Sequence, residues 1–309
     1  MPNFPTIDKL IQRFQVEPGK KFRLKHCDPA WAGDSKVPKA ERKKFAEDVL
    51  AENAAELADA QERLYASDSW SVLIILQAMD AAGKDGTIKH VLRGVNPQGC
   101  QVYSFKHPSA EELDHNFLWR CMKVLPERGR IGIFNRSYYE DVLIVKVHPE
   151  LVNTERIPGA KVNRQFWNGR YEDINSFEEH LSRNGTKILK FFLNVSKEEQ
   201  RKRFLERVTD PKKYWKFSPS DITERGYWDD YQAAYEEALE ATSTKHAPWY
   251  VVPADHKWVS RAIVARVITK TIDDLNAQYP EVDDAKMAEI EKARRILESE
   301  AESKAASNE

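Results

Sequence analysis

The residues best suited to chemistry stand between positions 78 and 87, where the chain reads Ala-Met-Asp-Ala-Ala-Gly-Lys-Asp-Gly-Thr. The apolar run 71–77 precedes this segment, and apolar residues at helical spacing follow it. A strand, a loop with a Gly-Lys pair and a helix form the setting of a phosphate-binding loop. Main-chain N–H groups, the helix N-terminus and the lysine ammonium group then face phosphate oxygens. We therefore predict a phosphate site made of Ala81, Ala82, Gly83, Lys84, Asp85, Gly86 and Thr87.

Two positions of this loop depart from the usual G-x-x-x-x-G-K-[ST] pattern. Ala78 replaces the first glycine, and Asp85 replaces the hydroxyl residue that normally holds Mg²⁺. Asp80 is an unusual addition, because a carboxylate inside the loop would repel a bare phosphate. We expect Asp80 to carry Mg²⁺ toward the phosphates, directly or through water. The alternative is that Asp80 only caps the following helix and that Gly83 is only a turn residue.

A second polar group follows the apolar segment 131–134 and comprises Asn135, Arg136, Tyr139, Glu140 and Asp141. We expect Arg136 at the carboxyl edge of a sheet, where α/β folds bind ligands and where its planar fork would clamp phosphates. A strand in this position usually ends in Asp, and the amide of Asn135 is a poorer magnesium ligand. Either Asp141 supplies the missing charge, or the metal depends on Asp80 and water. Asn135, Tyr139, Glu140 and Asp141 are predicted nucleotide contacts, although acids at a helix start also suit the helix dipole.

Arg203 and Arg207 are four residues apart and therefore share one face of a helix. In a closed site they could bridge two phosphate groups, as arginine fingers do. The alternative is that they form salt bridges with Glu199 and Glu206 on their own helix.

The elements that must position these residues alternate between short apolar strands and helices. The predicted strands are 71–77, 101–106, 131–134, 188–193 and 249–252, and the predicted helices between or beside them are 39–66, 85–95, 110–124, 171–183, 197–208 and 229–242. Such alternation predicts an α/β domain with a parallel sheet covered on both faces.

The chain divides into three predicted parts. Residues 1–38, with five prolines, are expected to form an irregular arm, and residues 39–275 the catalytic domain. Within that domain, about 197–230 is expected to be a lid, because residues 209–227 are aromatic and basic and interrupt the alternation. Residues 276–309 should form a charged C-terminal helix.

Composition bounds the class of protein. The chain has 309 residues, 41% hydrophobic and 31% charged, with a net charge of −1, which suits one large domain. Three widely spaced cysteines give neither a zinc pattern nor a disulfide framework. Without an apolar leader or an apolar run of membrane length, we expect a soluble cytoplasmic protein with no membrane partner.

The small net charge hides two basic segments. Residues 84–136 carry nine Lys or Arg against five Asp or Glu, and residues 187–216 carry ten against four. This pattern indicates a local polyanion site rather than a wholly basic nucleic-acid binder. Charge counts alone, however, favour ordinary solvated helix faces.

Several motifs resemble the second polyphosphate kinase family. They are Asp80 to Gly86 of the loop, Ser104 to Ser109 with Phe117 to Arg120, Phe134 to Asp141, Lys202 to Arg207 through Trp215 to Ser218, and Ala247 to Asp255. The resemblance covers residues 45–275 in the right order. The segment Val16 to Lys20 is similar to the third subclass of that family, whose members phosphorylate nucleoside mono- and diphosphates.

The resemblance implies a three-layer α/β/α P-loop kinase fold with a helical lid, a Mg²⁺ requirement, and assembly into homodimers or homotetramers. It also implies reversible transfer of the terminal phosphoryl group of inorganic polyphosphate to AMP or ADP, with other purine nucleotides left open. The predicted catalytic residues are Asp80, Lys84, Arg136, Arg203 and Arg207. A row of cations is expected to guide the polymer: Lys89, Arg93, Lys106 and Arg120.

Two other functions remain open from the sequence. An ATP-dependent nucleoside monophosphate kinase would share the fold and the chemistry. A non-enzymatic protein could use the basic segments to bind nucleic acid, but the chain shows no interleaved Arg/aromatic platform and no known nucleic-acid motif.

Overall fold

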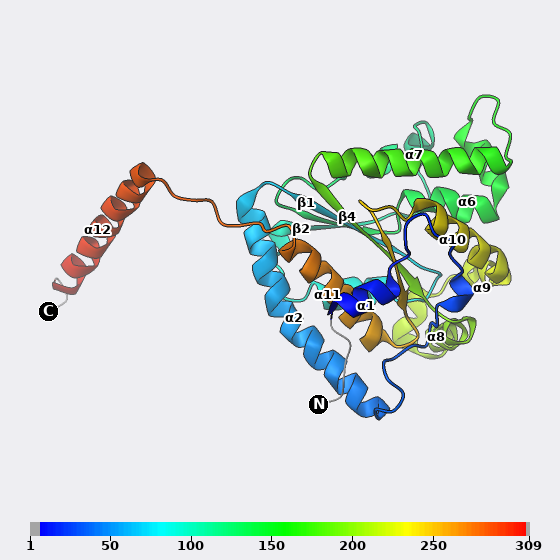
Figure 1. Ribbon diagram of the computed structural model, residues 1–309, viewed down its shortest axis with the longest axis horizontal. Coiled ribbons are helices and arrows are strands. Elements are labelled where there is room, and N and C mark those ends of the chain that lie inside the picture. Colours follow the sequence, from blue (N-terminus) through cyan, green and yellow to red (C-terminus); the bar gives the residue numbers. More distant parts are fainter. Residues whose placement is uncertain (1–6, 307–309) are drawn as a thin grey trace. The chain divides into compact units, whose positions relative to one another are not determined.

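A five-stranded parallel sheet lies at the centre of the computed structural model, which describes residues 7–306 (Figure 1). The strand order is β2-β3-β1-β4-β5. The strands are β1 (Ser71–Gln77), β2 (Cys100–Ser104), β3 (Ile131–Asn135), β4 (Thr186–Asn194) and β5 (Trp249–Pro253). All pairs are parallel. The predicted α/β class with a parallel sheet is therefore confirmed.

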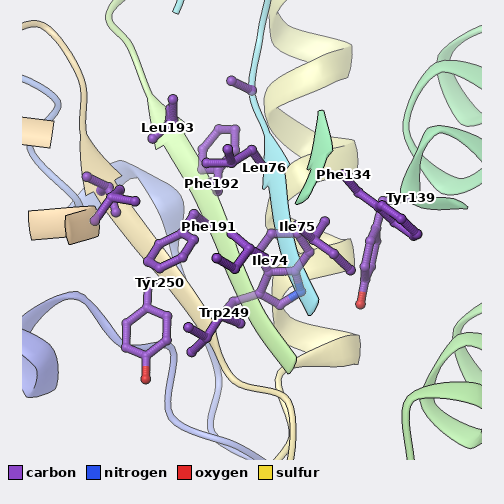
Figure 2. Packing of buried hydrophobic residues seen from close by; sticks show 14 of the residues in the cluster. Ile74, Ile75, Leu76, Phe134, Tyr139, Phe191, Phe192, Leu193, Trp249 and Tyr250 are labelled. Carbon is purple, nitrogen blue, oxygen red and sulfur yellow. The ribbon is translucent and has the colours of Figure 1, made fainter. Parts of the chain in front are cut away.

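Strand β1 is buried along its whole length, as its continuous apolar sequence requires. It lies between β3 and β4, and its last residues pair with the last residues of β3. Because parallel strands end at the same edge, the segments after β1 and β3 emerge side by side. Figure 2 shows Ile74, Ile75 and Leu76 of β1 beside Phe191 and Phe192 of β4.

Helices cover both faces of the sheet. In Figure 1, α7 (Arg164–Arg183) lies on one side, and α2 (Lys39–Ser67) and α11 (Lys257–Asp273) lie on the other. The other helices of this unit are α1 (Ile7–Phe14), α3 (Lys84–Val91), α4 (Ala110–Leu113), α5 (Trp119–Met122), α6 (Ile144–Val147), α8 (Lys197–Thr209), α9 (Pro219–Gly226) and α10 (Trp228–Thr242). Short 3-10 segments also occur: η1 (Leu24–His26), η2 (Pro97–Gly99), η3 (Tyr138–Val142), η4 (Pro149–Glu155) and η5 (Pro211–Lys216). The predicted helix 110–124 is thus two short helices.

The first 38 residues are less irregular than expected, although positions 1–6 lie outside the described residues. Besides α1, this stretch attaches to the edge of the sheet. The N–H of Val16 donates to the carbonyl of Trp249 at 2.8 Å, and Gln15 forms an antiparallel bridge with Tyr250. The segment therefore covers the otherwise open edge of β5.

The chain forms two units, Met1–Ala277 and Gln278–Glu309. The second unit contains α12 (Asp284–Ala306), whose described side chains are exposed and many of them charged, with ion pairs along the helix such as Lys286–Glu289. Among residues 7–306, no helix is long and apolar enough to cross a membrane.

Candidate active site

The segment after β1 forms a tight loop that leads into α3. Ala81 has a φ of 62° and Gly83 a φ of 110°, so two of its residues adopt the left-handed conformation. Glycine adopts this conformation at no cost, whereas alanine pays a strain energy. The loop therefore needs outside contacts to keep its shape.

Lys84 is the first residue of α3, and its side chain folds back over the loop. The Nζ atom donates to the carbonyl of Ala78 at 2.9 Å, and only 9% of the residue is exposed. Burial first and the nearby Arg136 second lower the pKa of Lys84 to about 8, against the attraction of Asp80. A buried ammonium group that donates to a neutral carbonyl is well suited to receive an anion.

Arg136 lies directly beyond the end of β3 and pairs with two carboxylates. Its Nη2 lies 2.7 Å from Oδ1 of Asp80, and its Nη1 lies 3.3 Å from Oε2 of Glu140. Glu140 is the main cause that raises the pKa of Arg136 above its usual value. The backbone of Arg136 itself adopts the left-handed conformation, with a φ of 65°. The structure therefore brings Asp80, Lys84, Arg136 and Glu140 together at the carboxyl edge of the sheet, as the sequence predicts.

Asp80, Arg136 and Glu140 line a small pocket of about 30 Å³, and residues of the predicted lid segment line it too. Asp221, Glu224 and Arg225 of α9 and Gln200 of α8 line it together with Asp80, Arg136 and Glu140. These four residues from α8 and α9 are not among the site residues predicted from the sequence. For Asp221, Glu224 and Arg225 the available signal was their place inside the basic, aromatic interruption 209–227, whereas Gln200 lies in the predicted helix 197–208 and carried no such signal.

Asn135 and Asp85 meet across the gap between β3 and α3. The Nδ2 atom of Asn135 donates to Oδ1 of Asp85 at 2.8 Å. In the usual P-loop pattern, the strand residue corresponding to Asn135 is Asp and the loop residue corresponding to Asp85 is Ser or Thr. In this chain the two are exchanged: the carboxylate lies on the loop and the neutral side chain lies at the end of the strand.

Asp141 and Tyr139 do not face this pocket, which corrects the prediction that both contact the nucleotide. Asp141 lies in a separate pocket, 3.8 Å from Nη1 of Arg170, and burial raises its pKa to about 7. Tyr139 is fully buried and donates to Oε1 of Glu178 at 2.8 Å. Both residues belong to the short 3-10 segment η3, in which helical spacing does not indicate the direction of side chains. Asp141 is thus also misplaced for a metal site shared with Asp80.

A buried ionic cluster lies beneath η3. Lys190 of β4 and Glu178 of α7 are both fully buried and 2.5 Å apart. The hydroxyls of Tyr138 and Tyr139 donate to Oε1 of Glu178, each at 2.8 Å. Lys190 also donates to the Tyr139 hydroxyl and to the carbonyl of Thr242. Through Tyr138 and Tyr139, the cluster anchors to the core the segment that contains Arg136 and Glu140. Figure 2 shows Tyr139 beside Phe134.

The two predicted lid arginines have different surroundings. Arg203 is buried and bonds to main-chain carbonyls and to Glu199, so it does not point into the pocket as a finger would. Arg207 is about one-fifth exposed and pairs with Asp221 of α9 at 2.9 Å. The salt-bridge alternative is therefore correct for Arg203 with Glu199, whereas Arg207 pairs with a residue on another helix.

Three of the four residues in the predicted cation row are exposed to solvent, and the fourth is buried. Lys89, Arg93 and Lys106 are exposed, and no ion pair involves them among residues 7–306. Arg120 is instead buried, and its Nη1 donates to the carbonyl of Lys106 at 2.8 Å. Lys106 and Arg120 line a cleft of about 390 Å³ together with Tyr103, Phe105, His107 and Lys123.

Comparison with known proteins places the chain in a family. Residues 40–280 match the family described as polyphosphate kinase 2. An ADP-polyphosphate phosphotransferase of Rhodopseudomonas palustris is 55% identical over 93% of this chain and 98% of its own length. An AMP/ADP-polyphosphate phosphotransferase of Meiothermus ruber is 43% identical over 89% and 97%. The crystal structure of polyphosphate kinase 2 from Arthrobacter aurescens superposes with a TM-score of 0.81 at 40% identity, covering 92% of this chain and 96% of that one. The chain therefore belongs to the polyphosphate kinase 2 family.

Proposed function

We propose that this protein is a polyphosphate-dependent nucleotide kinase that transfers the terminal phosphoryl group of inorganic polyphosphate to AMP, ADP or both. The observation that carries the proposal is the buried Lys84 at the end of the phosphate loop, which interacts electrostatically with Arg136 and Asp80, the ion pair that lines the neighbouring small pocket. The named activities of relatives that share about half of the sequence support the same substrates.

Transfer between two phosphates needs little acid–base chemistry, because the acceptor oxygen is already anionic. Catalysis then depends on alignment and on neutralising charge. Lys84 releases the carbonyl of Ala78 and grips the transferred group. Arg136 approaches from the end of β3, where its fork can bind two phosphate oxygens.

Asp80 and Asp85 are the residues that would hold Mg²⁺. The ion keeps several waters and takes one or two protein carboxylates with substrate phosphates, so a site with few protein ligands suits it. Among residues 7–306 there is no group of three acidic, His or Cys side chains arranged for a metal. When bound, Mg²⁺ would neutralise charge on the phosphates. With Asp80 engaged as a metal ligand, the guanidinium group of Arg136 would be available to substrate phosphates.

Exposed cations next to the loop suit a polymeric donor. Lys89 and Arg93 follow the phosphate loop, and Lys106 stands at the rim of the neighbouring cleft. A chain of condensed phosphates would find in them an electrostatic path to Lys84. The acceptor nucleotide then approaches from the side of Asn135 and Glu140. We further expect a homodimer or homotetramer in the cytoplasm.

The test is a product profile. Purified protein is given AMP or ADP with polyphosphate, and in parallel ATP replaces polyphosphate as donor for AMP. We expect ADP or ATP only with polyphosphate and Mg²⁺, and no product from Lys84→Ala. Comparable rates with ATP as the donor would instead support a nucleoside monophosphate kinase. Tight nucleic-acid binding at physiological salt, without any transfer, would support the non-enzymatic alternative.

A further inference from the structure

Helix α8 holds the phosphate loop through two buried side chains, Gln200 and Arg203, which are 1% and 5% exposed. Nε2 of Gln200 donates to the carbonyl of Asp80 at 3.0 Å. Nη1 of Arg203 donates to the carbonyls of Ala81 at 3.0 Å and Ala82 at 2.8 Å. Three consecutive carbonyl groups of the loop are therefore bound by one helix.

The remaining donors of Arg203 bind elsewhere. Nη2 donates to the carbonyls of Ala254 at 2.7 Å and Asp255 at 3.1 Å, just after β5. Nε donates to Glu199 at 2.9 Å. A guanidinium group has five N–H donors and no acceptor, and here every nitrogen has a protein partner. Arg203 therefore joins the phosphate loop to the segment after β5 and has no donor group left over for a substrate.

We propose that Gln200 and Arg203 are positioning residues that aim the N–H groups of the phosphate loop at the substrate, an inference that rests on the proposed phosphate site. In a planar trans peptide, the carbonyl and the next N–H point in opposite directions. Bonds from α8 to the carbonyls of Asp80 and Ala82 thus turn the N–H groups of Ala81 and Gly83 away from α8. These bonds also hold Ala81 in its costly left-handed conformation.

Gln200 extends this connection to the lid. Nη1 of Arg225 on α9 donates to Oε1 of Gln200 at 2.8 Å and to the carbonyl of Lys197 at 2.8 Å. One amide side chain therefore accepts from α9 and donates to the loop. Movement of α9 would change the orientation of Gln200. The position of the lid would thereby affect the conformation of the phosphate loop, without any contact to substrate.

Two conservative variants test the proposal. Arg203→Lys keeps the charge, but its single nitrogen cannot bridge the loop and the segment after β5. Gln200→Glu keeps the acceptor for Arg225 and loses the donor to the Asp80 carbonyl. The matched control is Arg201→Ala, because Arg201 is an exposed arginine of the same helix whose one ion pair among residues 7–306 is with Glu198.

Main-chain hydrogen exchange of residues 78–87, measured by mass spectrometry without nucleotide, is the first readout. We expect about tenfold faster exchange of this segment in both variants, with exchange of β4 unchanged. In the transfer assay, kcat should fall by about 10- to 100-fold with the KM for nucleotide nearly constant, because misalignment affects the reacting groups. Arg201→Ala should match the unmodified protein in both measurements.

Unchanged exchange of the loop in Arg203→Lys would overturn the proposal, and weaker tripolyphosphate binding at unchanged exchange would show a direct contact with phosphate instead. A loss of activity that only follows the unfolded fraction, measured by thermal unfolding, would equally overturn it. The exchange measurement does not depend on the donor. A protein that proved to use ATP would therefore refute the proposed function and leave this inference intact.

Discussion

The lowered pKa of Lys84 makes the proposed phosphate site sensitive to pH in a range where lysine does not usually titrate. Its pKa of about 8 arises first from burial and then from the neighbouring Arg136. Only the protonated ammonium group attracts phosphate. The free enzyme should therefore lose phosphate affinity as the pH rises through 8.

The size of this effect follows from the titration curve. With a pKa of about 8, Lys84 is about 90% protonated at pH 7 and about 10% at pH 9, so kcat/KM for polyphosphate should fall about tenfold over that interval. An ordinary lysine would stay almost fully protonated over the same interval. Phosphate groups lose their second proton near pH 6, so the substrate contributes little to the change above pH 7.

The assay is kcat/KM from pH 6.5 to 9.5 at saturating Mg²⁺ and nucleotide, since this ratio reports groups of the free enzyme. Lys84→Arg is the control, because its guanidinium group stays charged throughout; it should be slower at pH 7 and nearly independent of pH. A descending limb only near pH 10 would refute the shifted pKa. The same limb near pH 8 in Lys84→Arg would assign it to another group.

Three further predictions follow from the site and its surroundings. Asp80→Asn should lower turnover by about 10²- to 10³-fold, because the charge that positions both Mg²⁺ and Arg136 is lost; near-normal steady-state rates would contradict this role. Lys190→Met should lower the free energy of unfolding by about 3–5 kcal/mol, since the buried charge of Glu178 loses its cation and keeps, among residues 7–306, only the two tyrosine hydroxyls; urea unfolding that shows a loss of less than about 1 kcal/mol would argue against it. Asp141 has a pKa raised from 3.8 to about 7, so its charged form destabilises the fold as the pH rises through that range, and Asp141→Asn should gain thermal stability relative to the unmodified protein from about pH 5 to about pH 8. A stability difference that stays constant between those two pH values would count against the shift.

The sheet could be predicted from the sequence because strands buried on both faces are continuous apolar runs. Each of the five predicted runs is a strand in the structure. Helix α11 was not predicted. It is buried on much of its surface, so polar and apolar residues do not separate clearly into two faces. Residues 110–124 read as one helix, but Asn116 accepts the N–H of Leu118 and starts a second one.

The parts of the site that are local in sequence were predictable, and the long-range contacts were not. Asp80 and Lys84 lie in one motif, and Arg136 follows the strand next to β1, so strand pairing alone brings them together. For Arg203, helical spacing indicates which residues share its face. It does not indicate whether that face meets solvent or a loop 120 residues away in sequence. Only the packing of α8 on the phosphate loop decides this.

The hydrogen bond between Asn135 and Asp85 has a consequence for anyone who exchanges parts between related kinases. Restoring an acid at position 135 alone would set two carboxylates against each other at 2.8 Å, and a hydroxyl at 85 alone would leave this corner without a negative charge. Each single change towards the commoner motif is therefore expected to be harmful, although the pair of changes together returns the same charge. Positions 85 and 135 are therefore coupled through their hydrogen bond, and chimaeras or designed variants should carry both changes or neither.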